Sequence, residues 1–179
     1  MSENKAREEM LDRIEQRAMT TAPEWQHCAQ ATLSALTEEF NIPGAEDALK
    51  AATFMAGGTA ELGNTCGAFN GGIMALGLVA GRKQVSEPKF GGTEINELTG
   101  HEKRLDYAVE FYNRFIQANG TWLCRDIIMR HFGRQFDLLN NHDSFVEAGS
   151  RELCPRVVGQ AARLAAEIIL KMRDEGLIK

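Results

Sequence analysis

The sequence predicts an all-α protein folded as a single-domain helical bundle. Apolar residues recur at helical spacing through most of the 179 residues, and no segment shows the alternation typical of a strand. Turns containing glycine or proline separate the periodic segments. With 44% hydrophobic residues, the chain is long enough to bury one core. We expect one domain over residues 1–179, with a charged N-terminal helix over residues 1–20 and a bundle over residues 21–179.

The first predicted helix covers residues 2–19, a highly charged segment with one apolar stripe. This stripe consists of Met10, Leu11, Ile14 and Ala18. A charged helix of this length is marginal alone, so we expect it to lie on its own bundle or on a second subunit. Pro23 fits the first position of a second helix, which we expect to end near Phe40 with Cys28 facing inward.

A central helix is predicted over residues 66–80, with Thr65 as its N-cap. Gly67 and Gly71 lie one turn apart and leave one face of this helix without side chains. Glycine inside a helix costs about 1 kcal/mol relative to alanine, so a close contact should offset the loss. We expect another helix backbone, a ligand held at Cys66, or both, against this face.

The other segments complete the bundle. The periodicity predicts helices over residues 45–55, 101–118, 121–132 and 154–175, the last beginning at Cys154-Pro155. Cys124 falls in the first turn of the helix that Thr121 is expected to cap. Residues 83–99 show no sustained period and form an unusually long connection.

The composition excludes several classes of partner. The formal net charge is −5, and the basic residues are scattered, so neither a nucleic acid nor an anionic membrane surface is an expected partner. No stretch approaches the 18 apolar residues of a membrane span, and the first apolar run is too short and charged for a signal peptide. We therefore expect a cytoplasmic protein.

The four cysteines are the candidate site residues: Cys28, Cys66, Cys124 and Cys154. In a reducing compartment their expected roles are metal ligation, thiol chemistry or core filling. Cys66 and Cys154 fall at predicted helix starts, and Cys124 falls in a first turn, where the helix dipole is positive. That position favours a thiolate or an anionic thiolate-ligated group. We expect the four sulfurs to converge in one pocket.

These residues carry a resemblance to a known family. The order of Cys28, then Cys66-Gly67-Ala68-Phe69-Asn70-Gly71, then Cys124 and Cys154 resembles redox-active proteins of the C_GCAxxG_C_C type. The resemblance covers about residues 23–172. The resemblance implies an all-helical domain whose cysteines serve redox chemistry. It also implies that they act as iron–sulfur ligands, because the family is similar to the cluster-bearing part of split-Soret cytochromes. The chain lacks Cys-x-x-Cys-His, so no c-type haem is expected.

Three functions remain open at this point. The first is a redox protein in which the four cysteines hold one iron–sulfur cluster of unknown type, with Gly67 and Gly71 beside it, and exchange electrons with a partner protein. The second is a thiol–disulfide oxidoreductase with Cys66 as nucleophile. The third is a non-catalytic helical protein with a structural zinc. Whether the chain is an enzyme stays open, and we expect a homodimer.

Overall fold

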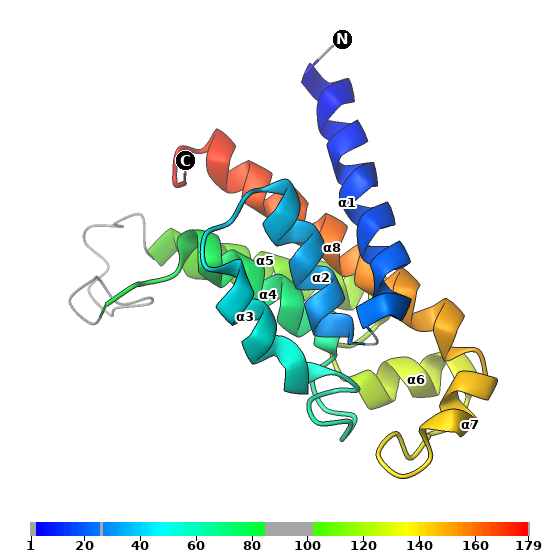
Figure 1. The fold of residues 1–179 in the computed structure, drawn as a ribbon. Helices are drawn as coiled ribbons and strands as arrows, with labels where there is room; N and C mark the ends of the chain where they lie inside the picture. The colour runs from blue at the N-terminus through cyan, green and yellow to red at the C-terminus, as the bar shows by residue number, and fades with distance from the viewer. Residues whose placement is uncertain (1–2, 26, 85–101, 179) are drawn as a thin grey trace.

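The computed structural model describes residues 3–25, 27–84 and 102–178 (Figure 1). These residues form one body of eight α-helices and a short 3₁₀ helix, η1, with no strand among them beyond an isolated bridge between Thr65 and Leu123. The predicted all-α fold is therefore confirmed. The elements are α1 (Glu3–Trp25), α2 (Cys28–Glu39), α3 (Ala45–Ala51), η1 (Ala52–Met55), α4 (Gly67–Ala80), α5 (Glu102–Asn119), α6 (Cys124–Phe132), α7 (His142–Glu147) and α8 (Ser150–Asp174).

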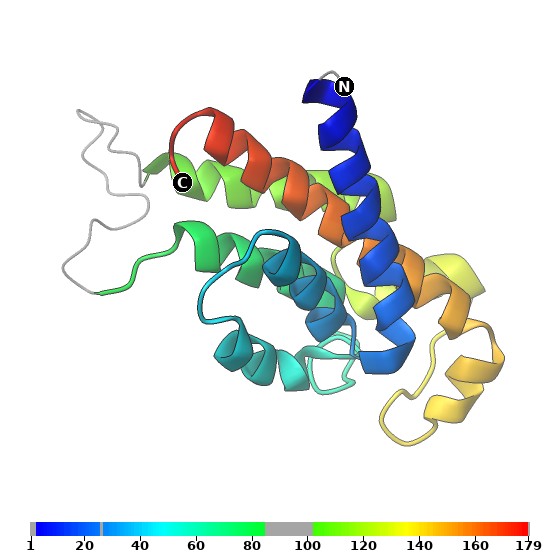
Figure 2. The same ribbon diagram turned by 45° about the horizontal axis from the view of Figure 1, so that its top comes forward.

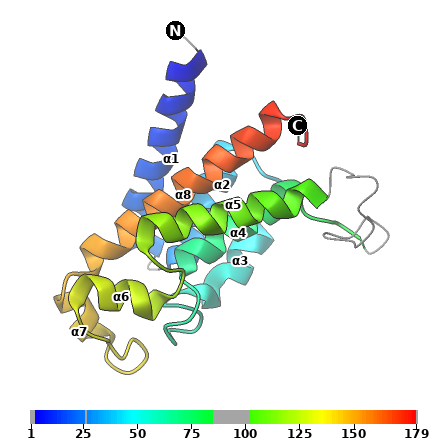
Figure 3. The same ribbon diagram turned by 180° about the vertical axis from the view of Figure 1, so that it is seen from behind.

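The long helix α8 is the centre of the bundle. It contacts α1, α2, α4, α5 and α7, and α2 packs in turn on α4. Figure 2 shows α1 crossing α8, and Figure 3 shows α5 lying over α4 and α8 on the opposite side. None of the described helices is long and apolar enough to cross a membrane.

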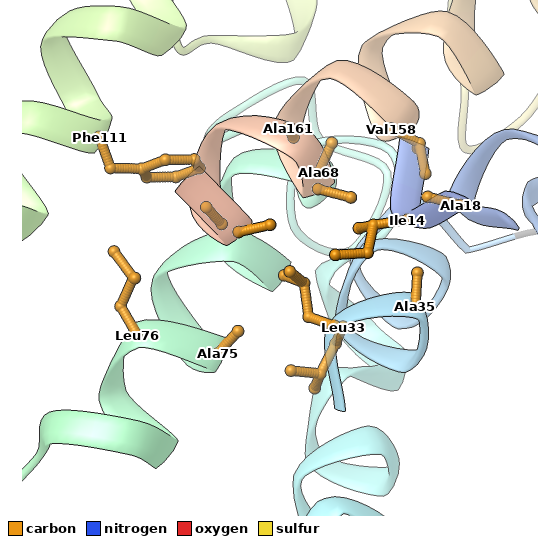
Figure 4. Packing of buried hydrophobic residues seen from close by; sticks show 14 of the residues in the cluster. Ile14, Ala18, Leu33, Ala35, Ala68, Ala75, Leu76, Phe111, Val158 and Ala161 are labelled. Carbon is orange, nitrogen blue, oxygen red and sulfur yellow. The ribbon is translucent and has the colours of Figure 1, made fainter. Parts of the chain in front are cut away.

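Five helices supply most of the main core (Figure 4), to which Ala52 of η1 and Ile127 of α6 also belong. Its side chains interdigitate where α1, α2, α4, α5 and α8 meet, and small residues allow the helices to come close. Labelled core residues in Figure 4 include Ile14, Leu33, Ala68, Phe111 and Val158. A second, smaller core of Ile128, Leu138 and Phe145 joins α6 to α7 and touches Cys124 and Cys154.

The N-terminal helix is longer than predicted. Pro23 does not begin a second helix but lies in the last turn of α1, which ends at Trp25. The preference of proline for a first helical position misled the assignment, because here the proline removes one intrahelical hydrogen bond without ending α1 before Trp25. Leu11, Ile14 and Ala18 are buried against α8 and α2. The bundle of the same chain thus covers the predicted apolar stripe.

The other boundaries follow the predicted pattern with three differences. Helix α6 begins at Cys124 with Leu123 as its N-cap, and Thr121, the predicted cap, only accepts a hydrogen bond from the Leu123 N–H. The central helix begins at Gly67, with Cys66 rather than Thr65 as its N-cap. The last helix begins at Ser150, four residues before Cys154. Gly149, in a left-handed conformation (φ 105°), separates it from α7 and is its N-cap. Pro155 therefore lies inside α8. The expectation for residues 83–99 falls, from residue 85 on, outside the described residues.

Candidate functional site

The four cysteines line one small cavity. Cys28 is the first residue of α2, Cys66 is the N-cap of α4, and Cys124 is the first residue of α6. The starts of these three helices lie in the lower half of the view in Figure 1. Cys154 is the fifth residue of α8 and reaches the cavity from the first turns of that helix. The structure thus brings together all four residues that the sequence singled out.

The cavity has a volume of about 20 Å³, and its remaining walls are entirely apolar. They are formed by Ala68, Ile127, Ile128, Leu153, Val157 and Val158. Cys66 is buried, with 6% of its surface exposed, whereas the other three cysteines are partly exposed. All four are free thiols. Sulfur is therefore the donor atom that the side chains around this cavity supply.

The glycines of α4 explain how two of these helices meet. A Cβ atom at Gly67 would lie 2.7 Å from the Met55 carbonyl oxygen, and one at Gly71 would lie 2.5 Å from the Ala29 carbonyl oxygen. The predicted close approach is observed, with the backbone of α2 as the neighbour. In contrast, a Cβ at Gly77 would meet nothing within 4 Å. The glycine face thus lets α4 pack directly on the start of α2, beside Cys28.

A left-handed turn forms the next wall of the site. All five residues from 57 to 61 have positive φ, and three of them, Thr59, Ala60 and Glu61, are not glycine. Each such residue costs about 1–2 kcal/mol relative to the right-handed conformation. Backbone hydrogen bonds hold the turn, among them Ala60 N–H to the Phe54 carbonyl at 2.8 Å. A Cβ at Gly58 would lie 2.7 Å from the Cys124 Cβ, so the turn reaches the site itself.

Backbone pairing fixes Cys66 relative to Cys124. The Cys66 N–H donates to the Trp122 carbonyl at 2.8 Å, and the Cys124 N–H donates to the Asn64 carbonyl at 2.7 Å. These bonds run on either side of the bridge between Thr65 and Leu123. Two helix starts that are far apart in sequence are therefore held in one register by main-chain atoms alone.

Cys28 and Cys154 form a thiol pair. Cys154 donates a hydrogen bond to the Cys28 sulfur, which lowers the pKa of Cys28, and the backbone N–H groups of Cys28 and Gly57 act in the same direction against burial. The same hydrogen bond, together with burial, raises the pKa of Cys154 well above its ordinary value. The pair thus favours one shared proton, with the negative charge on Cys28.

The other two thiols are held protonated. Burial raises the pKa of Cys66 to about 12, assisted by the negative charge on Cys28, while the N–H groups of Ala68 and Phe69 oppose the increase. Burial also raises the pKa of Cys124, with further contributions from Cys66 and Cys28. At Cys66, the increase in pKa caused by desolvation is therefore larger than the decrease expected from its position at a helix start. Cys28, not Cys66, is the better thiolate in this arrangement.

The four sulfur atoms suit a thiolate-ligated metal or cluster, but the cavity between them is small. Four cysteines are the usual ligands of iron–sulfur clusters and also a common zinc set. Among the described residues, however, no three His, Cys, Asp or Glu side chains are arranged to hold a metal ion. A cavity of about 20 Å³ holds roughly one water molecule. A cluster would match the ligand chemistry and would need more room than this cavity has.

Charged neighbours of the cysteines stay outside the cavity. Arg125, Arg151 and Arg156, which follow or flank the cysteines in sequence, are exposed and do not line it. His27 is the N-cap residue of α2, and its buried Nδ1 atom has no hydrogen-bond partner among the described residues. Nothing in the sequence around His27 indicates this unpartnered nitrogen, which appears only in the fold.

A family model agrees with the cysteine pattern. The model described as "Putative redox-active protein (C_GCAxxG_C_C)" matches residues 26–168. The chain belongs to this family. The description writes the central motif as Gly-Cys-Ala-x-x-Gly, whereas here Cys66 is followed by Gly67 and then Ala68, so Gly71 lies five residues after the cysteine. Comparison with curated proteins and with solved structures found no match.

Proposed function

We propose that the chain is a redox protein in which Cys28, Cys66, Cys124 and Cys154 hold one iron–sulfur cluster and exchange electrons with a partner protein. One observation carries the proposal: four cysteines from distant positions line a single cavity whose other walls are apolar. Core filling alone gives no reason for all four to meet at one point.

The chain's own residues have defined tasks in this proposal. The four sulfurs supply the ligands, and the start of α4 directs its Ala68 and Phe69 N–H groups toward Cys66. Gly57 interacts with the Cys28 sulfur through its N–H group. N–H groups near the sulfurs stabilise negative charge, and the apolar walls exclude water. When bound, a cluster would supply one-electron redox chemistry.

Anaerobic purification and reconstitution with iron and sulfide test the proposal. We expect brown protein with iron and acid-labile sulfide in equal amounts, and loss of most of both in each of the four Cys→Ser variants. Gly77→Ala is the control, because that position has open space and lies in the same helix as the N-cap Cys66. Colourless wild-type protein after reconstitution would reject cluster binding, and zinc found instead would assign a structural metal.

A second candidate is thiol–disulfide exchange, and the hydrogen bond between Cys28 and Cys154 favours it. Here Cys28 is the attacking thiolate and Cys154 the resolving thiol, in place of the Cys66 nucleophile expected from the sequence. Mass spectrometry of protein titrated with oxidised glutathione tests this candidate. A Cys28–Cys154 disulfide that forms first supports it, whereas uniform reaction of all four cysteines counts against it.

The homodimer remains part of the proposal. Its original support is reduced, because α1 buries its stripe on the same chain. The exposed apolar residues Leu105 (46% exposed) and Val109 (48%) on α5 now provide the better support. Light scattering of the full-length chain and of a Leu105→Glu, Val109→Glu variant tests it; a monomeric wild type rejects the dimer. The cytoplasmic location stays a prediction.

A further inference from the structure

A second and larger cavity lies directly beside the cysteine cavity. It has a volume of about 430 Å³, within the range of roughly 300–1,000 Å³ typical of small-molecule sites. Ile128, which is 3% exposed, lines both cavities, so the two share part of a wall. Arg125, the residue after Cys124, also lines the second cavity. A molecule bound there would lie next to the cysteine site without touching its sulfurs.

The walls of this cavity combine an apolar interior with a polar rim. Ile128 and Leu138 (4% exposed) are buried, and Phe136 is half-buried. Leu62 and Leu139, each 60% exposed, lie on the two loops that border the cavity. Apolar side chains of this kind, with a few polar groups, suit the hydrophobic body of a small ligand.

The charges at the cavity restrict the ligand further. Among the lining residues, Glu61 and Asp137 contribute two carboxylates against the guanidinium of Arg125, and a second guanidinium, that of Arg134, lies 4.4 Å from the Phe136 ring. Asp137 stays ionised, because hydrogen bonds from Asn140 lower its pKa. Carboxylates thus outnumber guanidinium groups among the lining residues, which disfavours an anionic ligand there. The Arg125 guanidinium is 53% exposed and has only a 3.8 Å contact with Asp126, so it retains donors for a neutral oxygen acceptor.

We propose that this second cavity binds an uncharged, conjugated ring carrying carbonyl oxygens, with the ring against Ile128 and Phe136 and an oxygen accepting from Arg125. Quinones and the ring system of flavins share this chemistry. The preference for a conjugated ring over an aliphatic ketone rests on the proposed redox function, because such a ring can exchange electrons with an adjacent site. The cavity's volume, apolar walls and charges do not depend on that function.

Binding is measured on the full-length protein, anaerobically and with reduced thiols. The probes are lumichrome, an uncharged flavin-type ring, and 2,3-dimethyl-1,4-naphthoquinone, whose substituted ring has no position for thiol addition. We expect at least one probe to bind one molecule per chain by calorimetry, and a preference between them identifies the flavin-type or quinone-type ligand. Flavin mononucleotide should bind more weakly than lumichrome, because its phosphate meets Glu61 and Asp137.

Two variants test the location, each with a matched control. Arg125→Met should weaken binding about tenfold or more, since it removes a charged hydrogen-bond donor. Its control is Arg151→Met, at an exposed arginine of α8 outside the cavity. Leu139→Glu replaces an apolar lining residue with a hydrated carboxylate and should also weaken binding of an uncharged ring, whereas Leu105→Glu on α5 should not. These exposed positions leave the fold intact, which circular dichroism would check.

Three results would overturn the proposal: neither probe binds, affinity is unchanged in both Arg125→Met and Leu139→Glu, or flavin mononucleotide binds more tightly than lumichrome. The outcome is separable from cluster binding. Colourless protein that binds a probe rejects the cluster and keeps the second cavity as a binding site. Brown protein that binds neither probe rejects the second cavity alone.

Discussion

The cysteine cavity and the α1–α8 interface both depend on α8, yet different interactions build them. Where α1 crosses α8, side chains make most of the contact, although Gly159 of α8 also comes close to the Glu15 carbonyl oxygen. Ile14 is fully buried, and Arg163 pairs with Glu8 and Asp12 at 2.6 Å each. Around the cysteines, backbone atoms make the contact. Glycines of α4 meet the backbone of α2, and main-chain hydrogen bonds join residues 63–66 to residues 122–125.

This difference indicates a division of tasks within one bundle. Side-chain packing and ion pairs tolerate small shifts, since rotamers can adjust, so the α1–α8 interface supplies stability without fixing positions closely. Backbone contacts leave no such freedom, so the cysteine end holds its thiols in a defined arrangement. Changes at the first region should alter stability alone, and changes at the second should alter stability and thiol reactivity together.

The largest effect is expected for Ile14→Ala. Ile14 has 0% exposure, and truncating a buried isoleucine costs about 2–5 kcal/mol through lost burial and the cavity left behind. Urea unfolding measures the loss. While the variant remains folded, its four thiols should react with a chromogenic disulfide at wild-type rates. Faster thiol reaction in the folded variant would show that the two regions are coupled.

Gly71→Ala should cost about 1–3 kcal/mol, because the added methyl group would lie 2.5 Å from the Ala29 carbonyl oxygen and force α4 away from α2. Here the thiols should also react faster. The matched control is Gly77→Ala, where space is open and replacement of glycine in a helix should stabilise by about 0.5–1 kcal/mol. Equal effects of the two substitutions would contradict the close-contact argument.

Raising the pH should destabilise the reduced, cofactor-free protein through its cysteines. The pKa of Cys66 is raised to about 12 in the folded state, so this thiol ionises more readily when unfolded. Its contribution to the free energy of unfolding is complete below about pH 9. That contribution decreases by about 1.4 kcal/mol per pH unit as the pH rises toward 12. Unfolding from pH 8 to pH 10 should show a shallower decline in Cys66→Ala. If the free energy of unfolding fell equally steeply with pH in both proteins, groups other than Cys66 would cause the decline.

The smallest of these effects is expected for Arg163→Gln, roughly 1 kcal/mol, because its ion pairs are partly exposed. The loss should shrink in high salt, which screens such pairs. Thermal unfolding at two salt concentrations measures both. A salt-independent loss would mean that Arg163 acts through packing of its aliphatic stem.

The sequence predicted those parts of the fold that leave a periodic or chemical signal. Helical spacing located most helices, and the helix-start positions of Cys66 and Cys124 suggested that cysteines would meet. Cys154 reaches the cavity as well, although α8 begins earlier than its Cys-Pro pair indicated. Pro155 lies in the second turn of α8, where it removes one intrahelical hydrogen bond without ending the helix.

Other parts left no signal in the sequence. The buried face of α5 consists of Tyr107, Phe111 and Phe115, but Leu105 and Val109 give an equally apolar stripe that is exposed. Only tertiary packing decides between the two faces. Likewise, Thr59 and Ala60 have no preference for positive φ, so nothing in their identity indicated the left-handed turn.

That turn has a consequence for mirror-image chemistry. A D-amino acid favours positive φ for the same steric reason that an L-amino acid avoids it. In a chemically synthesised chain, D-alanine at position 60, where φ is 53°, should therefore raise the free energy of unfolding by about 1–2 kcal/mol. Five consecutive residues of this L-amino-acid chain thus have the positive φ angles that D-amino acids prefer, and they lie beside Cys28 and Cys124.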